Sequence, residues 1–336
     1  MEISGILTFD PTKDITLRAK RLHIRGGQLI SGTPENPTTF QHKIELVGER
    51  TDETLVFDGT LSAGNKVLAV TGELSMHGVP KKTWTKLATN AYSGDNVIFT
   101  EDVSIDGEVG WAIGDELVIA SSTFERDDWE KVTITGVAVV GTNDSDFVSA
   151  QAREEYGASY GSSSQVSAAS DFVTYTGAYV TKVSLSAPIA KYHIGTEMAQ
   201  QQNKAIDTRA AVGNLNKNVV IEGYDKTNTN WNGNILVAAF KDFSVADPTN
   251  PETREGFCNL SHVAIRNCGQ LESTKAALRY EKGVGTGTPT VSSDIQDVVI
   301  TDSDTYGIYV NGYTDINFSN NFVFNSAPHN YYVTAS

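Results

Sequence analysis

The sequence predicts an all-β protein, in which an N-terminal β domain is followed by a right-handed parallel β-helix. Short runs rich in Val, Ile, Thr, Phe and Tyr recur along the 336 residues, and Gly, Asp, Asn and Pro bound them. Such runs are typical of short strands joined by tight turns. Convincing helical periodicity is almost absent, and the C-terminal half carries a weak repeat. Together these observations place the chain in the all-β class.

Strand-like runs fill the N-terminal half in close succession. They are DITLRAKRLHIRGGQLI (14–30), KIELVGE (43–49), KVLAVTGELSM (66–76), NVIFTEDVSI (96–105), ELVIASS (116–122) and KVTITGVAVV (131–140). One later segment, GTEMAQQQNKAID over residues 195–207, lacks this pattern and is predicted to hold a helical turn.

A change of composition separates the two halves of the chain. Residues 155–171, EYGASYGSSSQVSAASD, are rich in Gly, Ser and Ala and predict a surface loop or linker. The expected organisation is a β domain over 1–154, this linker, and a β-helix over 172–336. Strand-like patterns run up to both ends, so we expect a fragment of a longer chain with a β-helix truncated at its C-terminus.

The C-terminal half repeats a unit of polar residues, a few β-formers and a polar turn. Its copies are NVVIEG (218–223), SHVAIRNCG (261–269), QDVVITDSD (296–304) and NNFVFNSAP (320–328). The step from Asp297 to Asn320 is 23 residues, and so is the step from IYV (308–310) to YYV (331–333). This spacing suits coils of a parallel β-helix, with KGVGTGTPTVSS as an inserted loop. Asn218 and Asn321 are expected to hydrogen-bond the turn backbone.

The charge of the chain limits its partners. The net charge is −15, from 26 basic and 41 acidic residues. This balance argues against nucleic acid and anionic lipid, which both require a basic footprint. No run approaches the roughly 18 apolar residues of a membrane span. We predict that the chain binds no cofactor. The alternative is calcium, bound by the paired carboxylates Asp302 and Asp304 or by Asp144 and Asp146.

Cysteines and sequons add two weaker indications. Cys258 and Cys268 are too few for a disulfide scaffold and are spaced wrongly for a zinc knuckle. They form either one disulfide or two buried thiols. Asn143, Asn259 and Asn317 begin Asn-x-Ser/Thr sequons, which favour glycosylation and an extracellular or cell-surface location.

Several motifs resemble one known family. The stretch GELSMHGVPKKTWTKLATNAYSGDNVIFTEDVSID, followed by VGWAIGDELVIASS, resembles the G8 domain of cell-surface hyaluronidase, cell-migration-inducing hyaluronidase and fibrocystin-like proteins. LSAPIAKYHIGTE and DTRAAVGNLNKNVVIEG resemble that family's junction into its parallel β-helix. The matching positions are His77, Trp84, Trp111, Gly114 and Asp115. We expect His77 and Trp84 to pack or to line a groove, and Asp115 to hold a turn.

The resemblance also implies histidine motifs on adjacent coils of the hyaluronidases, and here the sequence departs from it. LESTKAALRYEKG contains no histidine, and Asn311 precedes Gly312 where the family pattern has His-Gly. His329 alone remains. Cleavage of a glycan needs an acid or base beside the scissile bond. The nearby carboxylates, which remain as alternatives, are Glu281, Asp302, Asp304 and Asp315.

Five residues are candidates for contact with a glycan. His193 is either a ligand-binding side chain or a satisfied junction histidine. Arg209 would clamp a sugar carboxylate or cap loop carbonyls. Arg279, Tyr280 and His329 complete the set.

Three functions follow from these patterns. The first is a non-catalytic extracellular module of a larger protein that recognises a glycan or an extracellular protein. The second is a glycosidase acting on a hyaluronan-like polysaccharide. The third is a purely structural solenoid of a fibrocystin-like receptor or surface filament. The missing histidines favour the first and third, and outward-facing aromatic side chains would favour the first over the third.

Overall fold

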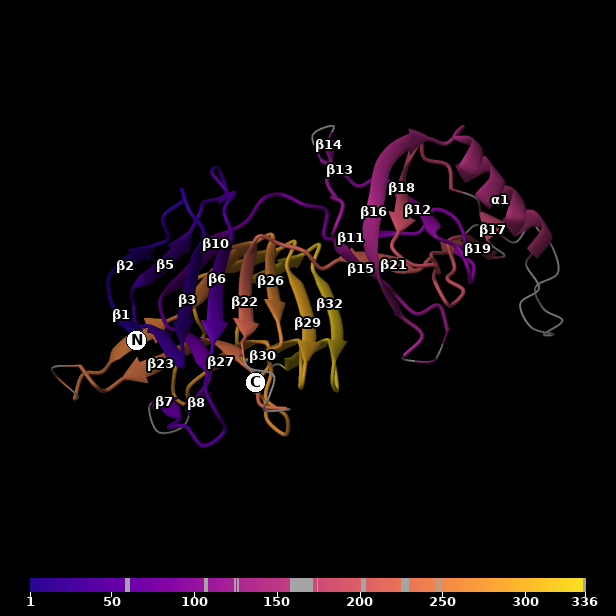
Figure 1. The fold of residues 1–336 in the computed structure, drawn as a ribbon. Coiled ribbons are helices and arrows are strands. Elements are labelled where there is room, and N and C mark those ends of the chain that lie inside the picture. Colours follow the sequence, from indigo (N-terminus) through magenta and orange to yellow (C-terminus); the bar gives the residue numbers. More distant parts are fainter. Residues whose placement is uncertain are drawn as a thin grey trace. The chain divides into compact units, whose positions relative to one another are not determined.

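A computed structural model describes the chain in two compact units (Figure 1). It describes residues 1–57, 61–105, 108–123, 125, 127–157, 172–173, 175–200, 204–224, 230–245, 247 and 249–334. The first unit combines Met1–Pro80 with Lys217–Ser336, and the second is Lys81–Asn216.

The first unit is a parallel β-helix built from three sheets. Sheet A contains β1 (Glu2–Ile3), β4 (Arg21–Ile24), β9 (Val67–Val70), β23 (Asn234–Asp242), β27 (Leu278–Lys282), β30 (Ile308–Asn311) and β33 (Tyr331–Thr334), and β24 (Glu252–Glu255) pairs antiparallel with β23. Sheet B contains β2 (Ile6–Thr8), β5 (Gln28–Ser31), β10 (Glu73–His77), β25 (Phe257–Ser261), β28 (Ser293–Gln296) and β31 (Ile316–Ser319). Sheet C contains β3 (Ile15–Ala19), β6 (His42–Leu46), β22 (Val219–Gly223), β26 (Val263–Arg266), β29 (Val299–Ser303) and β32 (Phe322–Ser326). The chain visits A, B and C in turn, so the predicted parallel β-helix is confirmed.

The second unit interrupts this β-helix between two consecutive strands. β10 ends at His77 in sheet B, and the next β-helix strand, β22, begins at Val219 in sheet C. Between β28 and β29 the same connection needs only residues 297–298. The division expected from the sequence, 1–154 followed by 172–336, therefore differs from the observed one, because the β-helix begins at the N-terminus and resumes at Lys217.

Inward-facing apolar side chains stack from coil to coil in the β-helix. In sheet C the strand registers align Leu17, Ile44, Ile221, Ile265 and Ile300. In sheet A they align Leu22, Leu68, Ile235, Leu278 and Ile308. All belong to or pack against one core. Parallel strands lie about 4.8 Å apart, so each side chain covers the one beneath it.

Polar corner residues mark the repeat that the sequence showed. Asp297 and Asn320 both have left-handed backbone conformations, with φ of 52° and 53°. Asp302 and Asn325, the next corner, have φ of 57° and 53°. Asn and Asp tolerate this region better than other non-glycine residues. Ile308 pairs with Tyr331 in parallel register, which confirms the 23-residue step.

Asn218 and Asn321 hydrogen-bond turn backbone as predicted. The Asn218 side chain accepts from the Val79 N–H at 2.9 Å and donates to the carbonyls of Thr38 and Phe40 at 2.7 and 2.9 Å. Asn321 accepts from the Val298 N–H at 2.8 Å and donates to the Ile295 carbonyl at 2.7 Å. The side chains thus replace backbone partners where the chain turns between sheets.

Replacing Asn218 with alanine is expected to lower the free energy of unfolding by about 1 to 2 kcal/mol, because backbone groups at a coil corner lose their partners. Urea denaturation checks this. Asn317→Ala, in protein produced without glycosylation, is the control, since the exposed Asn317 side chain bonds only one carboxylate oxygen of Asp294. Equal midpoints for the two variants would contradict the corner role of Asn218.

The second unit is mainly antiparallel. Its principal sheet has the order β11 (Trp84–Lys86), β21 (Ala211–Asn214), β15 (Glu116–Ile119), β16 (Glu130–Gly141), β18 (Tyr179–Leu185) and β12 (Val97–Glu101). The smaller pairings are β13 (Ser104–Ile105) with β14 (Glu108–Val109), and β17 (Phe172–Val173) with β19 (Glu197–Gln200) and β20 (Lys204–Ile206). The unit has a core of its own around Leu117, Ile119, Val183 and Val212.

One helix departs from the sequence prediction. α1 spans Ser145–Gly157, where no helical periodicity was recognised, and Asp144 caps it by accepting from the N–H groups of Asp146 and Phe147. Phe147 is buried against Phe99. The predicted helical turn over 195–207 is wrong, since β19 and β20 occupy its described part. Of the predicted linker, residues 155–157 end α1 and 158–171 lie outside the described residues.

In the described ranges, no helix has the length and apolar character needed to cross a bilayer.

Candidate ligand pocket on the outer face of the β-helix

His193 is fully buried in the second unit, and both its ring nitrogens are engaged. Nδ1 lies 3.0 Å from the Ala120 carbonyl oxygen and Nε2 lies 3.0 Å from Oε1 of Glu130. Glu130 also accepts from the N–H groups of Ala190 and Lys191. The structure therefore places His193 as a junction histidine, which was the second of the two predicted roles.

Arg209 lies in a network of ion pairs. Its Nε and Nη2 donate to the two carboxylate oxygens of Asp207 at 2.9 and 3.0 Å, and its Nη1 donates to Glu101 at 2.8 Å. Burial lowers the pKa of the guanidinium, but these hydrogen bonds outweigh it and raise the pKa above its usual value. The guanidinium N–H groups that would bind a sugar carboxylate in a bidentate manner already bind the carboxylate of Asp207.

Arg279 and Tyr280 lie in the β-helix and are inaccessible to a polymer. The Arg279 side chain is 3% exposed, donates to the Ser62 carbonyl at 2.6 Å and lies 3.4 Å from Glu281. Tyr280 faces the core, with its ring 5.4 Å from that of Tyr313. Burial raises the pKa of the Tyr280 hydroxyl well above its usual value. Neither residue forms an exposed glycan contact.

His77 and Trp84 belong to different units. His77 ends β10 with 3% of its surface exposed, and its ring nitrogens lie 3.0 Å from the Ser75 hydroxyl and 2.8 Å from the Ser261 hydroxyl. Burial lowers its pKa. The ring therefore links β10 to β25. Trp84 begins β11 in the second unit and is half-buried.

The Trp-x-x-Gly-Asp motif has a structural role in the second unit. Trp111 is 2% exposed and donates from Nε1 to the Lys82 carbonyl at 2.8 Å. Gly114 has φ of 91°, a region open to glycine. The Asp115 carboxylate accepts from Lys81 at 2.8 and 2.9 Å, from the Ala112 N–H at 3.0 Å and from Asn214 at 2.8 Å. Asp115 holds a turn, as expected.

The predicted calcium ligands are engaged with side-chain amides. Asp302 accepts from Asn325 at 2.8 Å and Asp304 accepts from Asn232 at 2.5 Å. Burial raises the pKa of Asp304. Among the described residues, no three His, Cys, Asp or Glu side chains gather as a metal site. Of the other pair, Asp144 caps α1 and Asp146 bonds Lys182.

The two cysteines are buried free thiols, so the second of the two alternatives for them holds. Burial raises the pKa of both thiols, that of Cys268 to about 12. Of the sequon asparagines, Asn143 and Asn317 are exposed and Asn259 is half-buried. Their glycosylation stays a prediction.

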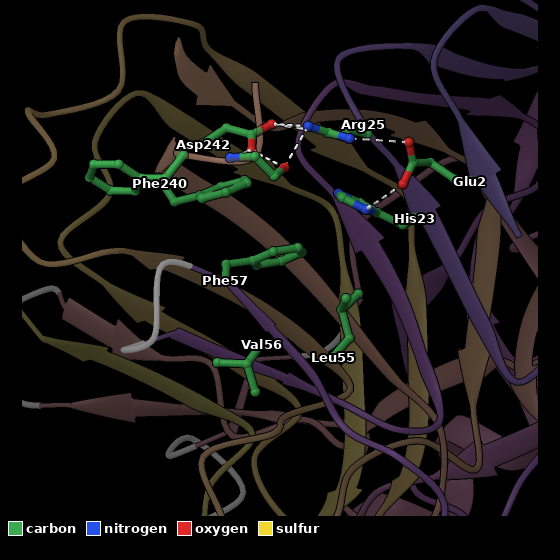
Figure 2. A pocket seen from close by; sticks show the side chains of 10 residues that line it. Glu2, His23, Arg25, Leu55, Val56, Phe57, Phe240 and Asp242 are labelled. Carbon is green, nitrogen blue, oxygen red and sulfur yellow. Dashed lines mark hydrogen bonds and ion pairs between the residues drawn. The ribbon is translucent and has the colours of Figure 1, made fainter. Parts of the chain in front are cut away.

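A pocket of about 440 Å³ opens on the outer face of sheet A (Figure 2). Its apolar wall consists of Leu55, Val56, Phe57, Phe240 and Phe243. β7 (Leu55–Phe57), which pairs antiparallel with β8 (Leu61–Gly64), supplies part of this wall. Phe57 stacks on Phe240 with ring centroids 4.5 Å apart, and both are buried. Val56 and Phe243 are each 51% exposed, so they offer apolar surface at the opening.

The opposite wall is polar and built around Asp242. Arg25 lies between Asp242 and Glu2 (Figure 2). It donates from Nε to Asp242 at 2.9 Å and from Nη2 to the Ser244 hydroxyl at 2.7 Å. Arg254 donates to the same Asp242 oxygen at 2.8 Å. Burial raises the pKa of Asp242, but hydrogen bonds from Ser244 and both arginines hold it well below its usual value.

His23 connects the two walls. Its Nε2 lies 3.0 Å from the Thr71 hydroxyl, its Nδ1 lies 3.9 Å from Glu2, and its ring centroid lies 5.0 Å from that of Phe57. The side chain is nearly buried, and this desolvation lowers its pKa to about 4. The imidazole is therefore neutral near pH 7.

An aromatic row lies on the outer face of sheet A, at its last two strands. We use this name for Tyr306, Tyr309, His329 and Tyr332. Tyr309 and Tyr332 stack with centroids 5.4 Å apart, and Tyr306 lies 5.0 Å from Tyr332. His329 stacks on Tyr332 at 6.1 Å and is exposed. Of the five predicted glycan contacts, His329 alone is exposed.

No motif in the sequence indicated the pocket. It combines residues from β1, β4, β7 and β23, and the positions of Glu2 and Asp242 differ by 240 residues. One weak signal was present, since the polar His23 lies between the apolar Leu22 and Ile24. Alternation along β4 places His23 opposite the inward-facing Leu22 and Ile24.

Comparison with known proteins defines the class of the chain. Residues 1–88 match the model of the G8 domain family. The chain therefore carries a G8 domain, which confirms the resemblance to this family; His77 and Trp84 lie within the matched residues, and Trp111, Gly114 and Asp115 lie outside them.

Two relatives identify the larger proteins in which similar chains occur. Human fibrocystin-L is 32% identical over 239 residues, which is 69% of this chain and 4% of that protein. Fibrocystin of Canis lupus familiaris is 25% identical over 270 residues, which is 80% of this chain and 5% of that protein. The chain thus spans about a twentieth of these relatives. Among solved structures, the Gp54 tailspike of Acinetobacter baumannii bacteriophage AP22 is 12% identical with a TM-score of 0.23, over 88% of this chain and 41% of that one.

Proposed function

We propose that the chain is a non-catalytic extracellular module of a larger protein, and that it recognises glycans through the pocket on sheet A. The pocket is the observation that carries this proposal. Ligand sites are typically concave, mostly apolar and fitted with a few convergent polar groups, with volumes of roughly 300 to 1,000 Å³. A cavity of about 440 Å³ fits this description.

The two walls suit a sugar ring. Sugars present C–H groups on their faces and hydroxyl groups at their edges. Phe57, Phe240 and Phe243 offer apolar surface to a face. Glu2, Ser244 and the neutral His23 offer hydrogen-bonding atoms to the edges.

The aromatic row supports recognition over a purely structural solenoid. Tyr306 is half-buried and Tyr332 is 38% exposed on the outer face of sheet A, where a polymer can reach them. β4 and β30 are separated in sheet A by β9, β23 and β27. At about 4.8 Å per strand spacing, β4 lies about 19 Å from β30, and β23, which also lines the pocket, lies about 10 Å from β30. An extended glycan of several sugars spans such a distance.

Binding without cleavage is supported by the engagement of several candidate acid–base side chains with other groups of the protein. Both ring nitrogens of His193 lie within hydrogen-bonding distance of protein oxygens. Asp302, Asp304 and Asp315 lie at or beside polar turns, and Glu281 pairs with Arg279. An extracellular location is supported by the fibrocystin relatives.

Incubation with labelled glycans tests the proposal. The chain is mixed with high-molecular-weight hyaluronan and with neutral polysaccharides, with calcium and with chelator, and both polymer size and co-migration are followed. We expect co-migration of at least one glycan without shortening, and weaker co-migration in Phe243→Ala. Val284→Ala is the control, since Val284 is exposed and lies outside the pocket lining. Shortening of the polymer would overturn the non-catalytic assignment, and co-migration of none would overturn glycan recognition.

A further inference from the structure

Among the described residues at the pocket, both guanidiniums are engaged by carboxylates of the protein. Arg25 and Arg254 both bond Asp242, Arg254 also bonds Glu252 at 2.6 Å, and Arg25 faces Glu2. Two guanidiniums thus meet three carboxylates, and with a neutral His23 this cluster carries a net negative charge; Arg254 and Glu252 lie behind the lining residues Arg25, Asp242 and Glu2. A uronate or sulfate entering here would have to displace a carboxylate of the protein.

Glu2 is the acceptor with unused capacity. Its Oε1 lies 3.5 Å from Nη1 of Arg25 and its Oε2 lies 3.9 Å from Nδ1 of His23. Both distances exceed those of strong charged hydrogen bonds, about 2.7 to 2.9 Å. The Glu2 side chain is 49% exposed. A hydroxyl group of a ligand is the donor that fits, because it supplies a hydrogen bond that the Glu2 carboxylate can accept and adds no charge.

The apolar wall selects the face that the ligand presents. Phe240 and Phe57 form its buried floor, and Phe243 extends it to the opening. An aromatic floor beside a carboxylate acceptor requires a ligand that is apolar on one side and carries hydroxyl groups on the other.

From this juxtaposition we propose that the pocket binds a neutral sugar residue, with its C–H face on Phe243 and Phe240 and a hydroxyl donating to Glu2, and that it rejects uronic-acid and sulfated sugars. This inference rests on the proposed function and specifies its ligand class. Like charges brought together without compensation weaken binding, which accounts for such rejection. The net charge of −15 also repels anionic sugars at longer range.

Calorimetric titration with defined oligosaccharides tests the ligand class. The neutral probes are hexasaccharides of cellulose, chitin, mannan and galactan, and the anionic probes are hexasaccharides of hyaluronan and polygalacturonate. We expect at least one neutral probe to bind with an affinity that changes less than about twofold between 50 and 300 mM salt, because screening acts on charged ligands. Anionic probes are expected to bind at least about tenfold more weakly.

Two variants locate the site. Phe243→Ala is expected to weaken binding of the neutral probe by about 3- to 10-fold, because an aromatic contact is lost. Glu2→Gln keeps the shape of the side chain but removes its charge, so it is expected to weaken the neutral probe about 5- to 10-fold and to strengthen the anionic probes. Circular dichroism and thermal melting show that each variant is folded, and Val284→Ala is again the control.

The outcomes separate the inference from the proposed function. Tight binding of anionic but not neutral probes, abolished by Phe243→Ala, would overturn the ligand class and leave glycan recognition standing. Binding of a neutral probe that neither variant changes would overturn the assignment to this pocket. Retention of no glycan, by titration or co-migration, would overturn both.

Discussion

Replacing Asp242 with alanine is expected to destabilise the β-helix by about 3 kcal/mol. Asp242 is 3% exposed and is the common partner of Arg25 and Arg254. Removing one member of a buried ion pair leaves the other charge uncompensated, which costs about 3 to 5 kcal/mol. The lower value applies because the two guanidiniums keep 24% and 18% of their side-chain surface in contact with water.

Urea denaturation with hydrogen exchange measured peptide by peptide checks this and assigns the loss to the correct unit. Peptides from β4, β23 and β24 are expected to lose protection, whereas those from β16 and β18 of the second unit are not. Glu252→Ala is the control, since the Glu252 side chain is 56% exposed and, among the described residues, forms an ion pair with Nη2 of Arg254 alone. If Asp242→Ala unfolds at the same urea concentration as Glu252→Ala, the carboxylate does not hold the two arginines.

Acidification is expected to weaken the β-helix between about pH 6.5 and pH 4 through His23. Burial lowers the pKa of His23 from 6.5 to about 4 in the folded chain. Below pH 6.5 the unfolded chain binds a proton that the folded chain excludes, so the free energy of unfolding falls as the pH falls. The stabilisation is complete above pH 6.5, and about 3 kcal/mol is lost by pH 4.

The variant His23→Phe isolates this effect. The charged groups that act electrostatically on His23 remain in the variant; they are Glu2, Arg25, Asp242 and Arg254. His77, whose pKa burial also lowers, contributes in the same direction in both proteins. Urea denaturation at several pH values is expected to give a difference between wild type and variant that grows toward low pH. A difference independent of pH would show that His23 titrates normally.

Several features were predictable because they depend on residues close together in the chain. Alternating apolar side chains and Gly, Asn or Asp turns indicate strands wherever one face is buried, and sheets A, B and C follow them. The 23-residue step from Asp297 to Asn320 was visible because both residues occupy a left-handed corner that favours Asn and Asp. Asn218 and Asn321 were predictable for a similar reason, since a short amide side chain can replace backbone partners at a turn.

The candidate site residues were predicted only in part, because residue type does not show burial or partners. His193 and Arg209 have the chemistry to contact a sugar. In the structure His193 is engaged by Glu130, which lies 63 residues away in the chain, and Arg209 is engaged by Asp207, which lies two residues away. Tyr280 was predicted as a glycan contact, but in β27, which pairs with β23 and β30, its side chain faces the core.

The sequence by itself determined the all-β class, the coil repeat and the G8 motifs, because strand pattern, corner residues and motif spacing are local properties of the chain. Only the tertiary structure decided where the β-helix begins, which loop holds the second unit, and where the pocket lies. Parallel pairing places Ile24, Val70 and Val237 on neighbouring strands of sheet A. Such pairing depends on side-chain stacking across long loops. It joins Glu2, His23 and Asp242 into one site, to which the antiparallel pair of β7 and β8 adds Phe57.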